Sequence, residues 1–185
     1  MTAPQPELVV LLDDDLQPCG VLPKSEVHHA DTPLHLAFSV YVFDDAGRLL
    51  VTRRAVGKTT FGGVWTNTCC GHPGPGEDLA EAVRRRLVTE LGVTVSELSL
   101  VLPDFRYEAT AADGVRENEF CPVFVARTTG DPAPDATEVE EWRWVDWATF
   151  CGLAEATPWA ISAWAAAQTP QLRARLGDAP VLPTA

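Results

Sequence analysis

The residues that could bind a metal ion or transfer a proton are concentrated in residues 66–93. This segment begins with two adjacent thiols, Cys69 and Cys70, continues through His72, and carries Glu90 near its end. Imidazole and carboxylate groups bind divalent metals, and thiols and carboxylates donate or accept protons. The segment is therefore the first candidate for a catalytic site.

A Gly/Pro-rich loop followed by a helix must position these side chains. The run GHPGPGE predicts a loop, because glycine supplies positive φ angles and proline lacks an amide donor. From Asp78 the apolar residues recur at helical spacing, and Gly92 stands where a glycine would cap the helix. This pattern predicts a helix of about three to four turns. Its apolar residues are Leu79, Ala82, Val83, Leu87 and Leu91.

Two further groups of titratable residues lie elsewhere in the chain. His28, His29 and His35 are three of the four histidines; a single histidine is most often a surface or capping residue, and we keep that interpretation for His29. Glu117 and Glu119 alternate in a predicted strand, so both carboxylates point to one face. An outward face would leave them solvated, whereas an inward face would require a metal or a shared proton. The apolar run that follows favours the inward face.

Residues 66–93 resemble the Nudix box, a loop–helix motif that places glutamates against a metal-bound diphosphate. Arg86 and Thr89 stand where the box has glutamates, which disfavours the usual hydrolysis because it needs several carboxylates on one helix face. The runs WTN-x-x-CGHP, DFRY, ENE-x-CPVF and TPWA-x-S-x-W resemble type I isopentenyl-diphosphate isomerase, a Nudix-fold family, and the resemblance extends over about residues 24–164. The residues that match the box are Gly71, Glu77, Arg85, Leu87, Glu90, Gly92 and Val93.

The resemblance implies two metal sites. At the first, manganese, zinc or magnesium would bind nitrogen and oxygen donors, and the ligand types alone do not select among these metals. At the second, Mg²⁺ would bridge Glu90 and phosphate oxygens of the substrate, because Mg²⁺ prefers few carboxylates together with phosphate and water. The ligands expected at the first site are His28, His35, His72, Glu117 and Glu119, and Cys70 is also assigned to the metal residues.

The resemblance also implies a reaction, the interconversion of isopentenyl and dimethylallyl diphosphate in isoprenoid biosynthesis. Moving the double bond requires a proton added at one carbon and another removed two carbons away, with a tertiary carbocation between the steps. By resemblance, Glu119 braced by Tyr107 donates the first proton and Cys70 removes the second, although the residues themselves leave this order open. Trp164 would cover the cationic carbon with its π face.

Basic residues would bind the diphosphate in a chain that is otherwise short of cations. Arg54 and Lys58 follow a predicted strand and precede the FGGVW loop; they are either an exposed strand end or, as the resemblance implies, diphosphate ligands. Arg86 replaces a carboxylate of the Nudix box with a cation suited to phosphate. Lys24 would otherwise be a solvated lysine, and the resemblance assigns it to the diphosphate as well.

The patterns and the resemblance together predict an α+β fold, a Nudix-type α/β/α sandwich with a mixed β-sheet in a single domain over residues 1–185. We expect a core at about 35–165, an N-terminal hairpin and metal-ligand segment at 7–35, and a C-terminal helical tail at 166–185. Turn residues predict hairpins within 7–22 and 36–52, and strands are predicted at 98–102, 105–109 and 138–147. Helices are predicted at 148–153 and 160–168, with a short Arg-rich surface helix after residue 169.

The composition excludes several classes of partner. A formal charge of −12 argues against nucleic acid or an anionic membrane. The longest apolar runs fall short of the roughly 20 residues of a membrane helix, and the N-terminus lacks the regions of a signal peptide, so we expect a cytoplasmic protein. Five irregularly spaced cysteines predict reduced thiols. We expect a monomer that binds a small isoprenoid diphosphate, although the sequence does not determine the oligomeric state.

Two other functions remain as alternatives, a Nudix hydrolase that cleaves a diphosphate and a non-catalytic module that binds one. The second would leave the cysteine, tyrosine, histidines and glutamates without a role. Cys69 stands where this family commonly has an apolar residue. In an extended segment its side chain should point away from Cys70, and we predict a small buried hydrophobic residue rather than an oxidation-sensitive partner.

Overall fold

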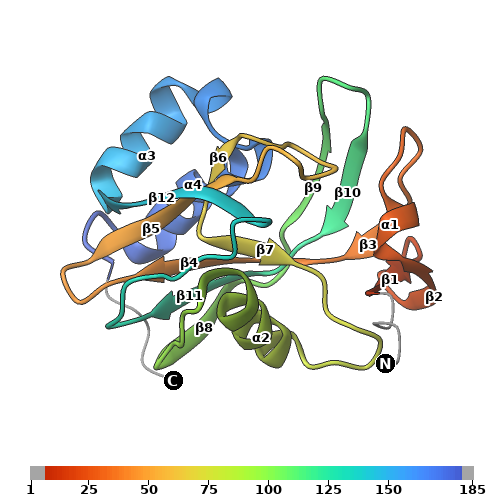
Figure 1. The fold of residues 1–185 in the computed structure, drawn as a ribbon, viewed down its shortest axis with the longest axis horizontal. Helices are drawn as coiled ribbons and strands as arrows, with labels where there is room; N and C mark the ends of the chain where they lie inside the picture. The colour runs from red at the N-terminus through yellow and green to blue at the C-terminus, as the bar shows by residue number, and fades with distance from the viewer. Residues whose placement is uncertain (1–6, 181–185) are drawn as a thin grey trace.

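Residues 7–180 are described by the computed structural model of the chain. Two ranges lie outside the described residues, 1–6 and 181–185. The first contains the start of the N-terminus that was predicted to lack a signal peptide, and the second is the end of the predicted C-terminal tail. Helices pack on both faces of a larger sheet, and a smaller sheet stands at one end of it (Figure 1). The predicted single-domain α/β/α sandwich with a mixed sheet is therefore confirmed.

Within residues 7–180 the strands form one seven-stranded and one five-stranded sheet. The larger sheet has the order β12-β5-β4-β11-β8, with β6 paired to β5 and β7 paired to β4; the smaller has the order β2-β1-β3-β10-β9. The pairs β4/β11 and β3/β10 are parallel and the others are antiparallel. The strands are β1 Leu8–Leu12, β2 Pro18–Pro23, β3 His35–Leu36, β4 Phe38–Phe43, β5 Arg48–Arg54, β6 Trp65–Thr66, β7 Cys69–Gly71, β8 Glu97–Leu102, β9 Arg106–Thr110, β10 Arg116–Phe120, β11 Val123–Arg127 and β12 Val139–Asp146.

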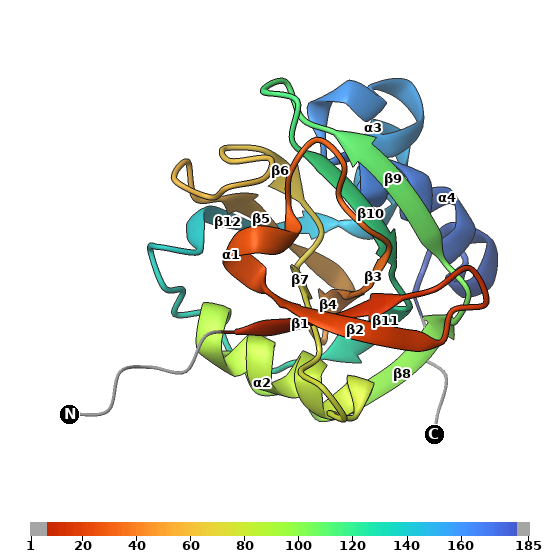
Figure 2. The same ribbon diagram turned by 90° about the vertical axis from the view of Figure 1, so that its right-hand side faces the viewer.

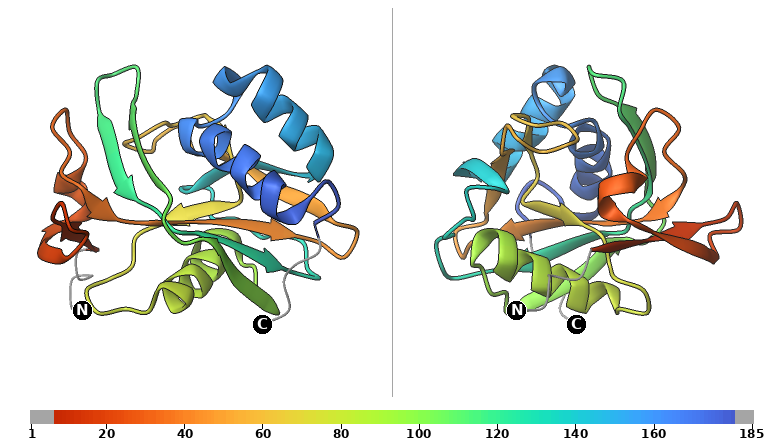
Figure 3. Two further views of the ribbon diagram at one scale, coloured as in Figure 1. Left: turned by 180° about the vertical axis from the view of Figure 1, so that it is seen from behind. Right: turned by 45° about the vertical axis from the view of Figure 1, so that its right-hand side comes forward.

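The helices divide between the two faces of the larger sheet. One face is covered by α2, and the other by α3 and α4, which lie against each other (Figures 1 and 3). None of the helices in residues 7–180 has the length and apolar character needed to cross a membrane. They are α1 Lys24–Val27, α2 Leu79–Leu91, α3 Trp147–Ala156, a 3₁₀ helix Pro158–Ala160 and α4 Ala163–Leu176.

Helix α2 has the boundaries that its sequence predicts. The Asp78 carboxylate accepts hydrogen bonds from the backbone N–H groups of Ala80 and Glu81, which satisfies two of the unpaired amides at the helix start. Gly92 ends the helix with a left-handed φ of 64°. The predicted apolar residues of α2 are buried, apart from Leu79, and pack on the sheet.

Two chain segments cross from one sheet to the other, and the crossing corrects one prediction. Residues 36–43, predicted as a single strand, are divided at Ala37 between β3 and β4. The segment that pairs with it in parallel is divided at Pro122 between β10 and β11, because proline has no N–H to continue the ladder of hydrogen bonds. Backbone bonds from Ala37 N to Phe120 O (2.9 Å) and from Ser39 N to Pro122 O (3.1 Å) join the two segments where they cross. Figure 2 faces the smaller sheet beside this crossing.

The predicted inward face of β10 is confirmed. Glu117 and Glu119 are 4% and 5% exposed, so both carboxylates are buried. Glu119 pairs in register with His35 of β3 and with Tyr107 of β9. The smaller sheet therefore brings two predicted ligands and the predicted tyrosine side by side.

The predicted end of the last helix is wrong. Helix α4 runs without interruption from Ala163 to Leu176, through Pro170, instead of ending near residue 168. A buried stripe continues past the proline, where Thr169 is 1% exposed and Leu172 is fully buried against the core. Burial of this stripe outweighs the hydrogen bond that proline removes.

We expect Leu172→Ala to lower the free energy of unfolding by about 2–5 kcal/mol, because it opens a cavity under α4. Urea denaturation measures this change. Arg175→Ala, at an exposed position of the same helix, serves as the control and should change stability by less than about 0.5 kcal/mol. Equal stability of the two variants would show that α4 beyond Pro170 is not packed on the core.

Candidate metal centre and active-site pocket

One pocket of about 230 Å³ contains nearly all of the predicted site residues. Its walls come from α1, the loop after β5, β7, α2, β9, β10 and α4, which are far apart in the sequence. Of the predicted site residues, His35 and Glu90 do not line it; both are buried behind its wall. The predicted residues that line the pocket are Lys24, His28, Arg54, Lys58, Cys70, His72, Arg86, Tyr107, Glu117, Glu119 and Trp164.

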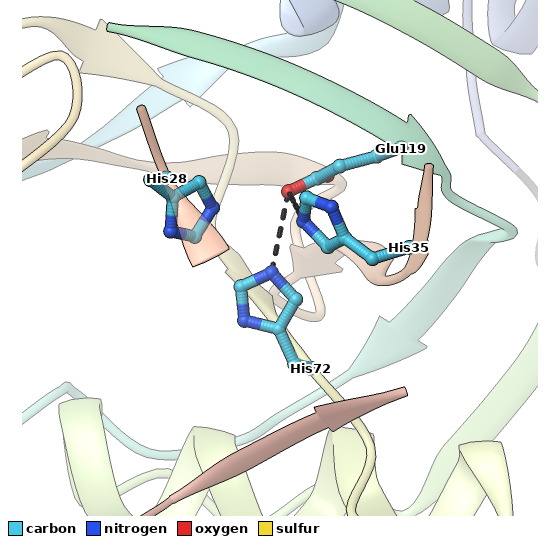
Figure 4. Close-up of side chains that lie close together, drawn as sticks. All are labelled: His28, His35, His72 and Glu119. Carbon is cyan, nitrogen blue, oxygen red and sulfur yellow. Dashed lines mark hydrogen bonds and ion pairs between the residues drawn. The ribbon is translucent and has the colours of Figure 1, made fainter. Parts of the chain in front are cut away.

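A four-residue cluster forms the candidate metal centre. His28, His35, His72 and Glu119 each offer one ligand atom, and these atoms lie within 4.8 Å of one another. The three imidazole rings surround the Glu119 carboxylate (Figure 4). Glu119 Oε1 lies 3.3 Å from His72 Nε2 and 3.4 Å from His35 Nε2. Three segments bring the histidines together: the end of α1, strand β3, and the chain directly after β7.

The hydrogen bonds around the cluster fit a bound cation. His35 Nδ1 lies 2.9 Å from the carbonyl oxygen of Pro33 and must donate to it, which leaves the Nε2 lone pair facing Glu119. Two acceptors at 3.4 Å repel unless a proton or a metal lies between them. His28 Nε2 and His72 Nδ1 are buried without a hydrogen-bond partner in the described structure. The residues present therefore fit a divalent metal with nitrogen and oxygen ligands.

The pKa shifts of three of the four cluster residues suit metal binding. His35 is the exception, because burial opposes its charge but the hydrogen bond with Glu119 raises its pKa. Burial, together with the nearby His72 and His35, lowers the pKa of His28 to about 3. Burial likewise lowers the pKa of His72, against the attraction of Glu119. Burial opposes the charge of Glu119, but hydrogen bonds with His35 and His72 hold its pKa well below the usual value. A neutral imidazole and an ionised carboxylate are the ligand forms that a metal requires.

Glu117 is set apart from this cluster. The Tyr107 hydroxyl lies 2.6 Å from Glu117 Oε2 and 2.9 Å from Glu119 Oε2, and its single proton serves the two carboxylates. Burial and the charge of Glu119 raise the pKa of Glu117. Of the five ligands predicted for the first site the structure therefore groups four, with Glu117 joined to them through Tyr107. Cys70, also predicted as a metal residue, is not part of this group.

The two adjacent cysteines point in opposite directions, as their extended backbone predicts. Cys70 lines the pocket, and burial raises the pKa of its thiol to about 12. Cys69 faces α2 within the apolar cluster, and its sulfur lies 3.4 Å from Glu90 Oε2. The prediction that Cys69 is a small buried hydrophobic residue pointing away from Cys70 is confirmed.

The predicted diphosphate ligands are already paired within the protein. Lys24 contacts Glu7 at 3.0 Å, Lys58 pairs with Glu138, and Arg86 pairs with Glu90. Arg54 donates a hydrogen bond to the Thr60 carbonyl oxygen at 3.0 Å, and its guanidinium group lies over the Trp164 ring. Three of the four predicted diphosphate ligands are thus held in ion pairs.

Sequence reasoning missed several residues around the pocket. Glu7 and Glu138 are partners of the basic residues, and nothing in their local sequence distinguished them from solvated acids. Ser39 and Asn67 are fully buried polar residues that contact Cys70, and the fully buried Gln168 contacts Ser39. Asn67 lies in the WTN run that was recognised, which is the one signal that could have found it.

Comparisons with known proteins agree with this geometry. A family model described as the NUDIX domain matches residues 33–166. An isopentenyl-diphosphate Delta-isomerase from Frankia alni is 63% identical over 160 residues, covering 86% of this chain and 82% of the relative. One from Mycolicibacterium vanbaalenii is 62% identical over 91% of this chain and 92% of its own. The solved structure of DR0079 from Deinococcus radiodurans has a TM-score of 0.67 at 18% identity, covering 89% and 98% of the two chains, which shows the shared fold.

We expect His28→Ala to weaken the binding of Mn²⁺ or Zn²⁺ by at least about tenfold, because it removes one of the clustered imidazoles. Isothermal titration of chelator-treated protein measures the affinity. The neighbouring His29→Ala is the matched control and should bind the metal like the wild type, since His29 is exposed and lies outside the cluster. Unchanged affinity in His28→Ala would contradict a metal centre at these residues.

Proposed function

Because the chain belongs to the isopentenyl-diphosphate Delta-isomerases of the NUDIX domain family, we propose that its pocket is the site at which isopentenyl and dimethylallyl diphosphate are interconverted. One observation carries the assignment of residues. A thiol, a tyrosine-linked pair of carboxylates, an indole ring and a set of cations line the same pocket. Each corresponds to a requirement of the reaction.

The reaction moves a carbon–carbon double bond by one position. A proton added to the terminal carbon gives a tertiary carbocation, and loss of a proton two carbons away restores a double bond. One group must donate a proton, another must accept one, and water must be kept from the cation. No bond to phosphorus breaks, so the diphosphate has only to be held in place.

Cys70 and the Glu119–Tyr107 pair are the proposed proton-transfer groups. The resemblance implies that Glu119 with Tyr107 donates the first proton and that Cys70 accepts the second. Because the reaction is reversible, the same groups exchange roles in the other direction, for which the thiol form of Cys70 is the donor and the ionised Glu119 is the acceptor. In the first direction the proton of the pair is the one on the Tyr107 hydroxyl. After one turnover a proton has passed from one group to the other, and exchange with solvent or the reverse reaction restores the starting state.

Trp164 is the proposed partner of the carbocation. Its ring is 1% exposed, lines the pocket, and lies 5.7 Å from the Tyr107 ring between centroids. An aromatic face stabilises a desolvated cation by about 2 kcal/mol. Its burial also leaves little room for water that could trap the cation.

The basic residues and the metals complete the proposed site. Lys24, Arg54, Lys58 and Arg86 would bind the diphosphate, and Glu90 is the residue that would hold a Mg²⁺ ion to neutralise it. Because Glu90 is paired with Arg86 behind the pocket wall, that ion pair would have to open first. A metal at the histidine cluster would be Mn²⁺, Zn²⁺ or Mg²⁺, and when bound it would supply fixed positive charge beside the Glu119 carboxylate. The histidines themselves hold that carboxylate in orientation next to Tyr107.

Hydrolysis of the diphosphate is the less well supported alternative. It requires carboxylates on the pocket side of α2, whereas this helix presents Arg86 there and carries Thr89 at an exposed position. Arg86 neutralises Glu90 through an ion pair. Release of phosphate from the substrate would favour this alternative.

We expect Cys70→Ala to lower kcat for isomerisation by about 10²- to 10⁴-fold, since it removes one proton-transfer group. Proton NMR of isopentenyl diphosphate in D₂O with Mg²⁺ and Mn²⁺ should show deuterated dimethylallyl diphosphate with the wild type only. Cys151→Ala is the control, because this buried cysteine lies in α3 outside the pocket lining. Full activity of Cys70→Ala would exclude the assigned role.

We expect Arg54→Lys to raise KM by about tenfold or more with a smaller effect on kcat, because lysine lacks the forked donors that arginine offers to phosphate. Steady-state kinetics with isopentenyl diphosphate measure both constants. Arg53→Lys, one residue away and outside the pocket lining, is the matched control. Equal KM values for the two variants would argue against Arg54 as a diphosphate ligand.

A further inference from the structure

A single amide oxygen connects two of the proposed active-site residues. Asn67 is fully buried between β6 and β7. Its Oδ1 accepts hydrogen bonds from Trp164 Nε1 at 2.9 Å and from Cys70 Sγ at 3.4 Å. A third donor, the Thr66 hydroxyl, lies 2.8 Å away. The thiol and the indole ring are therefore held against the same atom.

The orientation of the Asn67 amide is fixed by its neighbours. Its Nδ2 donates to the backbone oxygens of Val40 and Cys69, each at 3.0 Å. Carbonyl oxygens only accept and an indole N–H only donates, so exchanging the amide oxygen and nitrogen would break these bonds. The oxygen therefore has to face Cys70, and the S–H of Cys70 points toward it.

A second contact holds the Cys70 sulfur from another side. Ser39 Oγ lies 3.3 Å from Cys70 Sγ and accepts a hydrogen bond from Gln168 Nε2 at 3.0 Å. Gln168 in turn accepts from the Tyr41 hydroxyl at 3.0 Å. These buried groups satisfy one another, so the polar network around the thiol is rigid.

We propose that Asn67 is a positioning residue for the isomerisation, which sets the location of the Cys70 thiol relative to the Trp164 ring. The proposal rests on the function assigned above. A proton-transfer group and a cation-stabilising ring must both meet the substrate at the correct distances, and a shift of about 1 Å costs about 100-fold in rate. Asn67 is absent from the pocket lining and from the four-residue metal cluster, so it acts through the two side chains that it holds.

A purely structural role is the competing explanation, because the Nδ2 bonds tie β7 to β4. Thr68 offers a matched comparison. Its hydroxyl donates to Leu50 O at 2.6 Å and accepts from Val42 N at 2.8 Å, so it also joins strands from a buried position. The partners of the Thr68 hydroxyl are Val42 and Leu50, whereas Asn67 Oδ1 bonds Cys70 and Trp164. Thr68→Val therefore reports the cost of losing a buried tie between strands without moving the active site.

The test compares N67A, N67D and Thr68→Val with the wild type by steady-state kinetics, urea denaturation and ¹⁵N NMR of the indole N–H groups, with the Trp164 signal assigned from Trp164→Phe. We expect N67A to lower kcat about 10- to 100-fold with KM within about twofold. Its Trp164 indole signal should shift and lose protection from hydrogen exchange. N67D keeps the accepting oxygen and should retain a higher kcat than N67A, whereas Thr68→Val should lose stability and keep kcat.

Three results would overturn the proposal: wild-type kcat in a folded N67A, equal losses of kcat in N67A and Thr68→Val, or an unshifted Trp164 signal in N67A. If N67A does not fold, the test rests on N67D. An N67D protein that has lost the wild-type Trp164 signal, and whose kcat is as low as that of unrelated core variants, would contradict the role of the oxygen. Absence of isomerisation by the wild type would instead contradict the proposed function, and the indole spectrum would still report the contact.

Discussion

The burial of the Glu119 carboxylate among imidazole rings is the interaction on which the rest of the site depends. An unpaired buried carboxylate would cost several kcal/mol, so the fold has to supply partners for it. His35 comes from the neighbouring parallel strand, His72 from the chain after β7, and Tyr107 from the antiparallel strand beside it. These elements meet where two segments cross between the sheets. The crossing therefore serves the site as much as the fold.

The two sides of the pocket use charge in different ways. At the histidine cluster, buried ligand atoms converge on one point, and the lone pairs of their nitrogen atoms are available to a cation. At the basic side, Lys24 and Lys58 are paired with Glu7 and Glu138. A diphosphate that binds these lysines has to replace the carboxylates, so its affinity is the difference between two sets of ion pairs rather than their sum.

The fold itself does not determine the chemistry. Folds in general host many unrelated functions, so the function of a chain has to be argued from its site. In this chain the Nudix helix is retained with its caps, but Arg86 occupies a position where the box has a carboxylate. The distinction lies in a few side chains that face the pocket, which the rigid scaffold positions.

The sequence by itself determined the α+β sandwich, the boundaries of α2, the opposite orientations of Cys69 and Cys70, and the inward face of β10. The sandwich follows from the resemblance of residues 66–93 to the Nudix box. The other three follow from periodicity, capping or strand alternation, which act over a few residues. Only the tertiary structure decided that α4 continues through Pro170, that Glu7 and Glu138 pair with the basic residues, and that Asn67 joins Cys70 to Trp164. Those outcomes depend on burial and on hydrogen bonds between residues far apart in the chain, such as the bond from Trp164 to Asn67. A local sequence pattern does not determine which distant residues meet in the folded chain.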